Sequence, residues 1–144
     1  MVLKRGFTLI ELLVVISVIG ILVSIITSSF TTSQKRGRDT KRRADLQAIQ
    51  KSLEQCYALN SLYPAVAQVV SGSPLICGTQ TTMNLIPSDP KSTGVYTYST
   101  TAELDAYCYC ALLEQTGGGN ANTAGANGLC SLTAGDYQCV TNQQ

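Results

Sequence analysis

The sequence predicts an α+β fold in which one long N-terminal helix packs on a small antiparallel sheet. Three observations lead to it: a long apolar run near the N-terminus, an amphipathic stretch after it, and short β-branched and aromatic runs between turn residues further on. The chain has 144 residues. A membrane-length segment therefore leaves room for about one small domain.

The first helical element is an apolar segment spanning residues 7–34. It contains few helix breakers and exceeds the roughly 20 residues that a bilayer-spanning helix needs. A secretory signal peptide fits less well, because its apolar core has only about 7–15 residues. Small residues at Ser17, Gly20 and Ser24 are compatible with close helix packing as well as with ordinary membrane-helix composition.

Glu11 is the only ionisable side chain between Phe7 and Gln34. A carboxylate in hydrocarbon costs roughly 2.5–3.5 kcal/mol on insertion scales, so its presence requires a reason. A plain membrane anchor would explain every feature of this segment except Glu11. We therefore expect a partner that supplies a positive charge.

Residues 35–61 are predicted to continue the same helix as an amphipathic stretch. Its apolar residues are spaced three, four and three apart, which places them on one face. These residues are Leu46, Ile49, Leu53 and Cys56. The helix is expected to end at Asn60-Ser61, because Tyr63-Pro64 disfavours continuation.

A basic cluster opens this amphipathic stretch, although the net charge of the whole chain is only +1. Its members are Lys35, Arg36, Arg38, Lys41, Arg42 and Arg43, with only Asp39 opposed. Binding of nucleic acid or of anionic lipid headgroups is one interpretation. We favour a solvated helix face that also pairs with acids on neighbouring copies, because no aromatic residues interleave with the charges to stack bases.

Residues 62–144 are predicted to form a disulfide-containing β domain. Strands are expected at 95–99, 107–114 and 137–141, a short helix at 79–85, and loops at 65–78 and 116–128. The last loop is rich in Gly, Asn and Ala and is expected to be long and mobile. Strands in this order favour an antiparallel meander covered by the apolar face of the helix.

The chain contains six cysteines, all after the apolar segment: Cys56, Cys77, Cys108, Cys110, Cys130 and Cys139. An even number in such a domain predicts disulfides and an oxidising compartment. A metal site is the rival interpretation, but Cys-x-x-Cys is absent and Cys108-Tyr-Cys110 matches zinc spacing poorly.

Cys108 and Cys110 face the same side of the expected strand, with Cα atoms about 6.6 Å apart, at the far edge of disulfide reach. We therefore expect each to bond elsewhere, to Cys130 or Cys139. Cys56 would then join Cys77 and tie the helix end to the following loop, although six cysteines allow fifteen pairings.

The stretch Lys4-Arg5-Gly6-Phe7-Thr8-Leu9-Ile10-Glu11-Leu12-Leu13-Val14 resembles the processing site of type IV prepilins and type II secretion pseudopilins. The resemblance implies that residues 1–6 are a leader peptide. A membrane-embedded prepilin peptidase would cut between Gly6 and Phe7 and methylate the new amino group of Phe7. Residues 45–64 resemble the corresponding region of pilins less specifically.

The resemblance also implies a function, that of a structural subunit of a helical homo-oligomeric filament. Glu11 would neutralise the Phe7 amine of an adjoining subunit, and misregistered docking would leave a costly unpaired charge. The precursor would lie in the inner membrane and the filament at the cell surface, where its loops would serve adhesion. A pseudopilin of a secretion or DNA-uptake system is the close alternative.

Membrane orientation involves a conflict between two signals. The basic cluster outnumbers Lys4 and Arg5, so a count of basic residues alone favours an outside N-terminus. We expect the N-terminus inside, because the processing site must reach its peptidase and the cysteines require an oxidising exterior.

Two other classes of function compete with a filament subunit. One is a single-span anchored binding protein that never assembles. The other is an enzyme, which we do not expect: the chain lacks His and offers no nucleophile–base pair.

No cofactor is expected. Calcium at Asp89, Asp105 and Asp136 is a weaker alternative, because no Asp-x-Asp spacing occurs and Asp is common in turns.

Overall fold

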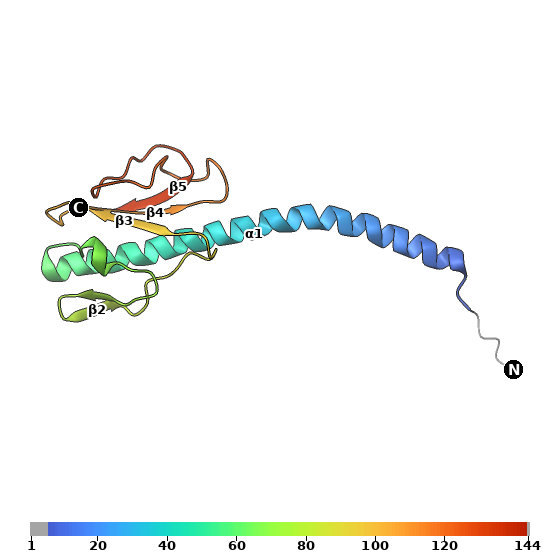
Figure 1. The fold of residues 1–144 in the computed structure, drawn as a ribbon, viewed down its shortest axis with the longest axis horizontal. Helices are drawn as coiled ribbons and strands as arrows, with labels where there is room; N and C mark the ends of the chain where they lie inside the picture. Colours follow the sequence, from blue (N-terminus) through green and yellow to red (C-terminus); the bar gives the residue numbers. More distant parts are fainter. Residues whose placement is uncertain (1–5, 144) are drawn as a thin grey trace. The chain divides into compact units, whose positions relative to one another are not determined.

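The computed structural model of the chain describes residues 6–143, apart from the side chains of residues 26–28. It forms two compact units, Met1–Lys35 and Arg36–Gln144. Helix α1 (Leu9–Asn60) contributes to both (Figure 1). The predicted fold class, a long N-terminal helix with small antiparallel sheets, is confirmed. Residues 1–5, most of the expected leader, lie outside the described residues.

In the part of the first unit that the structure describes, the helix is apolar and its large apolar side chains are exposed. Its described large apolar side chains between residues 7 and 25 range from 50% exposed at Val18 to 87% at Phe7. The hydroxyls of Ser17 and Ser24 donate back to the carbonyls of Leu13 and Ile21, so their polar atoms are satisfied within the helix. By length and composition, α1 is the one described helix that could cross a membrane.

The second unit packs the amphipathic part of α1 against a three-stranded antiparallel sheet of order β3-β4-β5 (Figure 1). The strands are β3 (Tyr96–Thr100), β4 (Tyr107–Leu112) and β5 (Tyr137–Thr141). A short 3-10 helix η1 (Val66–Gln68) and a separate hairpin, β1 (Leu75–Cys77) and β2 (Gln80–Met83), lie between α1 and β3 in the sequence.

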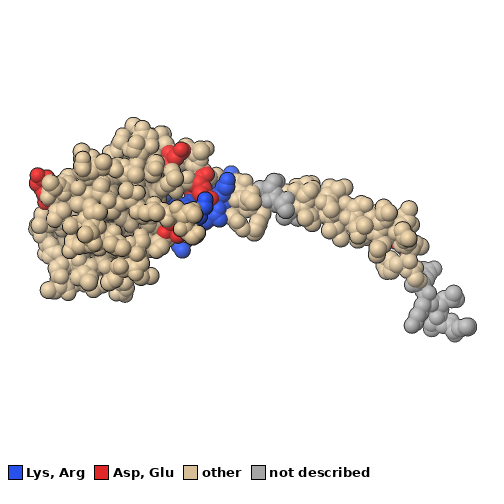
Figure 2. All heavy atoms as spheres, viewed as in Figure 1, with Lys and Arg blue, Asp and Glu red and all other residues tan. Residues whose placement is uncertain are grey.

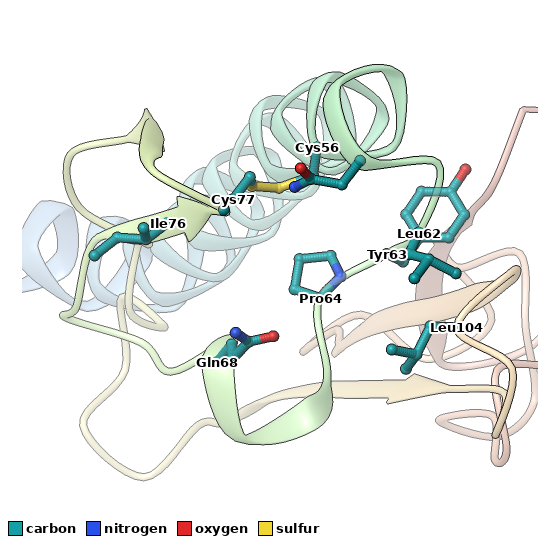
Figure 3. A pocket seen from close by; sticks show the side chains of 10 residues that line it. Cys56, Leu62, Tyr63, Pro64, Gln68, Ile76, Cys77 and Leu104 are labelled. Carbon is teal, nitrogen blue, oxygen red and sulfur yellow. A yellow bond between two sulfur atoms is a disulfide. The ribbon is translucent and has the colours of Figure 1, made fainter.

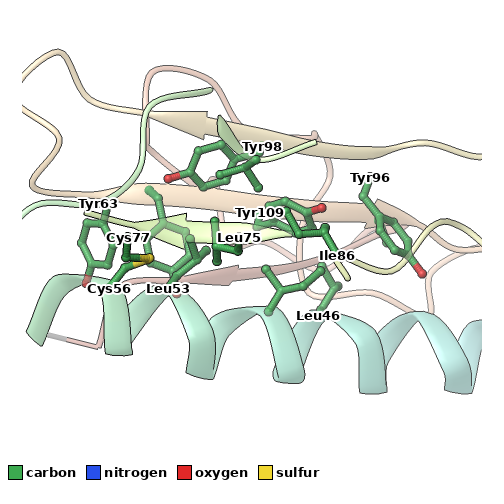
Figure 4. Packing of buried hydrophobic residues seen from close by; sticks show 14 residues of the cluster. Leu46, Leu53, Cys56, Tyr63, Leu75, Cys77, Ile86, Tyr96, Tyr98 and Tyr109 are labelled. Carbon is green, nitrogen blue, oxygen red and sulfur yellow. A yellow bond between two sulfur atoms is a disulfide. The ribbon is translucent and has the colours of Figure 1, made fainter. Parts of the chain in front are cut away.

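Tyrosines fill much of the space between helix and sheet, which suits a chain with no Trp and two Phe (Figure 4). Leu46, Ile49 and Leu53 of the predicted helix face are fully buried against this layer. Buried tyrosine hydroxyls require hydrogen-bond partners. Tyr96 donates to Asp45, and Tyr63 and Tyr107 both donate to Glu54. The helix thus supplies both the apolar contacts and the acceptors.

Strand β4 is buried on both faces. Tyr107 and Tyr109 face the helix, whereas Cys108 and Cys110 join a second buried cluster with Ala121 and Cys139. This second cluster lies under the segment that the sequence predicts to be a mobile loop. In the structure that segment is tied down, because Ala121 and Tyr137 exchange two backbone hydrogen bonds of 2.9 Å. Gly119 permits this approach, since a Cβ there would clash with the Tyr137 carbonyl.

The short helix predicted at residues 79–85 is wrong, because β2 occupies this position. Cys77 pairs with Gln80, which leaves a two-residue hairpin turn at Gly78 and Thr79. Gly78 has φ +63°, a value that favours glycine in such turns. The β-branched Thr81 and Thr82 then suit a strand better than a helix.

Truncation of the core should destabilise the second unit. Leu53→Ala removes a fully buried side chain and should cost about 2–5 kcal/mol of unfolding free energy. Leu85, which is 62% exposed, provides the matched control, and Leu85→Ala should stay within about 0.5 kcal/mol. Denaturant unfolding of the full chain in detergent, followed by tyrosine near-ultraviolet circular dichroism, measures both. Equal losses would contradict the assigned core.

Candidate functional site

The N-terminal site lies where the chain enters α1. Gly6 and Phe7 precede the helix and are exposed. Thr8 is the residue before its first turn, and the Glu11 carboxylate accepts hydrogen bonds from the Thr8 backbone N–H at 2.9 Å and from its hydroxyl at 2.8 Å. The Thr8 hydroxyl in turn accepts from the Glu11 backbone N–H at 3.4 Å. This reciprocal arrangement is a capping box.

The capping box gives Glu11 a local role that the sequence reasoning overlooked. The signal was present, since Thr8-x-x-Glu11 before an apolar run is the sequence signature of such a cap. Both donors are neutral, and within residues 6–143 the carboxylate forms no ion pair. The cap therefore orients the negative charge toward the start of the chain without neutralising it. A cation supplied there would find the acceptor already positioned.

A second site is a buried ion cluster around Arg42 in the second unit. The Arg42 side chain is only 2% exposed. Its guanidinium donates to both carboxylate oxygens of Asp89 at 2.7 and 2.8 Å. It also donates to Asp39 at 2.7 Å and to Glu114 at 3.2 Å. One cation from α1 thus joins the segment before β3 to the segment after β4.

Arg38 and Asp39 complete the cluster. Arg38 donates to both oxygens of Glu114 at 2.5 and 2.7 Å. The Asp39 carboxylate accepts the backbone N–H groups of Glu114 and Gln115 at 2.9 and 3.0 Å. The segment after β4 is therefore attached to the helix by side-chain ion pairs and by hydrogen bonds from its backbone N–H groups to the Asp39 carboxylate.

The cluster shifts the ionisation of its members. Hydrogen bonding from Arg38, reinforced by Arg42, lowers the pKa of Glu114 to about 2. Burial alone would raise the pKa of Asp89, but hydrogen bonds from Arg42 and from the Lys91 backbone N–H outweigh burial and lower it. The Asp89 and Asp39 carboxylates raise the pKa of Arg42 against the opposing effect of its burial. All three groups are thus charged at neutral pH.

The expectation of a solvated basic helix face is wrong for Arg42 and Asp39, which are buried against the sheet domain. The sequence could not reveal this, because Asp89 and Glu114 lie 47 and 72 residues from Arg42. Arg36, Lys41 and Arg43 remain exposed, and Arg43 also donates to the Gly118 carbonyl.

The three carboxylates considered for calcium have separate partners. Asp89 binds Arg42, Asp105 accepts from the Thr101 hydroxyl, and Asp136 accepts from the Gly117 backbone N–H. In residues 6–143 they belong to no group of carboxylates that could hold an ion together.

The cysteines form Cys56–Cys77, Cys108–Cys130 and Cys110–Cys139 disulfides. The choice between Cys130 and Cys139, left open by the sequence, follows from register: Cys110 is directly opposite Cys139 across β4 and β5. The four sulfurs of the last two bridges lie within 4.8 Å of one another. Because these sulfurs are bonded in pairs, they serve here as crosslinks and not as thiolate ligands.

Comparison with known proteins bears mainly on the N-terminal half. Residues 1–27 match the family described as the prokaryotic N-terminal methylation motif. A type II secretion system core protein G from Dickeya chrysanthemi is 32% identical over 65 residues, covering 45% of this chain and 42% of that protein. The corresponding protein from Klebsiella pneumoniae is 34% identical over 65 residues, covering 45% and 46%.

A type IV pilin is also similar. The major pilin PilA of Myxococcus xanthus is 31% identical over 71 residues, covering 49% of this chain and 32% of that protein. The matches thus cover less than half the length of these curated relatives. No solved structure matches the chain. The predicted resemblance to prepilins and pseudopilins is confirmed.

Loss of Arg42 should destabilise the second unit more than loss of a neighbouring charge. Arg42→Met leaves three carboxylates partly or fully buried without their shared cation, which should cost about 3–5 kcal/mol of unfolding free energy. Lys41→Met, at the adjacent exposed position, should change it by less than about 0.5 kcal/mol. Chemical denaturation compares them, and similar losses would show that the cluster is not structural.

Stability should also fall in acid. Glu114 has a folded-state pKa of about 2, below its ordinary value of 4.5. The unfolded state therefore binds more protons in this range, so the stabilisation is present above about pH 4.5 and is lost as the pH falls toward 2. Glu114→Gln should flatten this part of the profile, whereas the exposed Glu103→Gln should preserve it. Denaturation midpoints between pH 6 and 2 test the difference, and an unchanged slope in Glu114→Gln would refute the assignment.

Proposed function

We propose that the chain is a structural subunit of a helical filament of the type IV pilus kind. The observation that carries the proposal is the first unit: a helix that is apolar on all sides, unpacked in the single chain, and interrupted by one oriented carboxylate. In a membrane, lipid covers those side chains. In a filament, the same surfaces of other copies cover them.

The charge chemistry supports assembly after processing. Cleavage between Gly6 and Phe7 would create an ammonium group at Phe7, one residue before the capping Thr8. Methylation leaves that amine protonated, and its charge matches Glu11 of an adjoining copy. Pairing lowers the cost of burying both charges and penalises incorrect register. Prepilin peptidase and the inner membrane are thus the proposed partners of the precursor.

Two machines remain candidates for the assembled form. We favour a pilus at the cell surface, where loops of the second unit would contact other surfaces. A pseudopilus of a type II secretion system is the second candidate, and the similarity to core protein G of several bacteria supports it. A non-assembling anchor is the alternative from another class, but it uses Glu11 only to cap the helix, a role that a neutral Gln also fills.

Mass spectrometry of the mature protein tests the processing step. The proposal predicts a chain that begins at Phe7 and carries one methyl group on its amino terminus. A Gly6 substitution that blocks cleavage should keep residues 1–6 and prevent methylation. A mature chain that starts at Met1, or that is cut near Ser28 as a secretory signal would be, would overturn the proposal.

Mechanical shearing separates a filament subunit from an anchor. Filaments released from intact cells should contain the processed chain, and electron microscopy of that fraction should show fibres. Surface fibres of micrometre length would favour a pilus over a short periplasmic pseudopilus. Complete retention of the processed chain in the membrane as monomers, with no fibre in either compartment, would support the anchored binding protein.

A further inference from the structure

The second unit carries opposite charges at its two ends. Strand β4 runs beside α1 in the opposite direction, because Tyr107 at its start contacts Glu54 whereas Glu114 beyond its end contacts Arg38 and Arg42. One end of the unit therefore lies near Arg36, where α1 enters it, and the other lies near Asn60, where α1 ends. Figure 2 shows Lys and Arg gathered at the former end, with some acidic side chains beside them, and a further acidic group at the latter end.

The basic end presents four exposed cations: Arg36, Lys41, Arg43 and Lys91. Arg38 and Arg42 lie at the same end, but they already form ion pairs with Glu114 and Asp89 in the buried cluster. Asp136 is the one exposed acid near this end, and its carboxylate binds a backbone N–H. Within residues 6–143 none of the four cations forms an ion pair. Their charge is available to another molecule.

The acidic end combines the β3–β4 turn with a shallow hollow. Glu103 and Asp105 lie exposed in this turn, which is held to the end of the helix segment by a 2.8 Å hydrogen bond from Tyr63 N–H to the Leu104 carbonyl. Beside the turn is a hollow of about 200 Å³. Leu62, Pro64, Ile76 and Leu104 line it together with the Cys56–Cys77 bridge (Figure 3).

We propose that the acidic end of one copy receives the basic end of another copy. The lining of the hollow is mixed, since Asn60 and Gln68 also contribute to it. Its apolar part suits the aliphatic stems of Lys and Arg, and the Glu103 and Asp105 carboxylates suit their charged heads. Asn60 and Lys41 are separated by 19 residues of helix, or about 28 Å at 1.5 Å per residue. Copies in this contact are thus displaced by roughly 30 Å along the helix axis. This contact rests on the proposed filament. It fixes the register between copies in addition to the pairing of Glu11 with the Phe7 amine of another copy.

A second copy fits these observations better than nucleic acid or lipid. Either polyanion would engage the basic end alone and would leave the acidic turn and its hollow without a role. One chain carries both complementary surfaces at opposite ends, which is what a repeating head-to-tail contact requires. Complementary charges of this kind suppress wrong docking geometries.

Charge reversal with rescue tests the contact in cells that assemble the full chain. Lys41→Glu and Glu103→Lys should each lower the yield of sheared filaments at least about tenfold, because each places like charges opposite one another. The double variant should recover most of the yield. Lys51→Glu reverses an exposed charge between the two ends and should leave the yield unchanged. All variants should retain the parental melting temperature and a methylated Phe7.

Carbodiimide coupling of mixed 14N- and 15N-labelled filaments supplies a direct readout. It should join Lys41 or Lys91 of one copy to Glu103 or Asp105 of another, and Lys41→Arg should assemble normally while losing the link at residue 41.

Normal filaments from Lys41→Glu would overturn this contact and leave the filament proposal intact. Absence of filaments from the unmodified chain would overturn both. If Lys41→Glu weakened binding to duplex DNA or to anionic vesicles without changing filament yield, the basic end would serve that polyanion instead.

Discussion

The first unit depends on its one carboxylate, which must be neutralised when the apolar side chains around it are covered. Within residues 6–143 neither requirement is met, because the described large apolar side chains from Phe7 to Ile25 are at least half exposed and Glu11 accepts hydrogen bonds from neutral donors on Thr8. A bilayer covers the apolar side chains, but only a cation neutralises the carboxylate. In the proposed filament, an amine created at Phe7 on another copy would supply it, and cleavage and assembly would then belong to one mechanism.

In the second unit, a small sheet domain is fixed on one face of a helix. Hydrophobic burial alone leaves a sheet free to slide along such a face. The Arg42 cluster restricts that freedom, because one buried guanidinium must contact Asp39, Asp89 and Glu114 together. A buried ion pair adds little net stability over an apolar replacement, but an arrangement that separates its partners leaves an uncompensated buried charge. On the other face of the sheet, the Cys108–Cys130 disulfide ties the segment between β4 and β5 to β4, and Cys110–Cys139 crosslinks the two strands themselves.

The elements best predicted from the sequence are those with local signals. The apolar run and the stripe at Leu46, Ile49 and Leu53 predicted the helix, and the alternation of tyrosines predicted β3 and β4. Strand β2 was mistaken for a helix because the turn at Gly78 was overlooked. The Arg42 cluster was beyond prediction, since its partners meet only through the tertiary fold. At the N-terminal site, the processing motif predicts the roles of Gly6, Phe7 and Glu11, which stay predictions, and the capping role of Thr8 was missed despite a local signature.

The most direct measurement of the central claim is the filament yield of Glu11→Gln. Glutamine also serves at this position of a capping box, so the substitution removes the charge and retains an acceptor for Thr8. The account predicts a chain that is inserted, cleaved and methylated at Phe7 but does not polymerise. If the glutamine variant forms filaments as readily as the unsubstituted chain, the negative charge is not needed for assembly and the account is wrong.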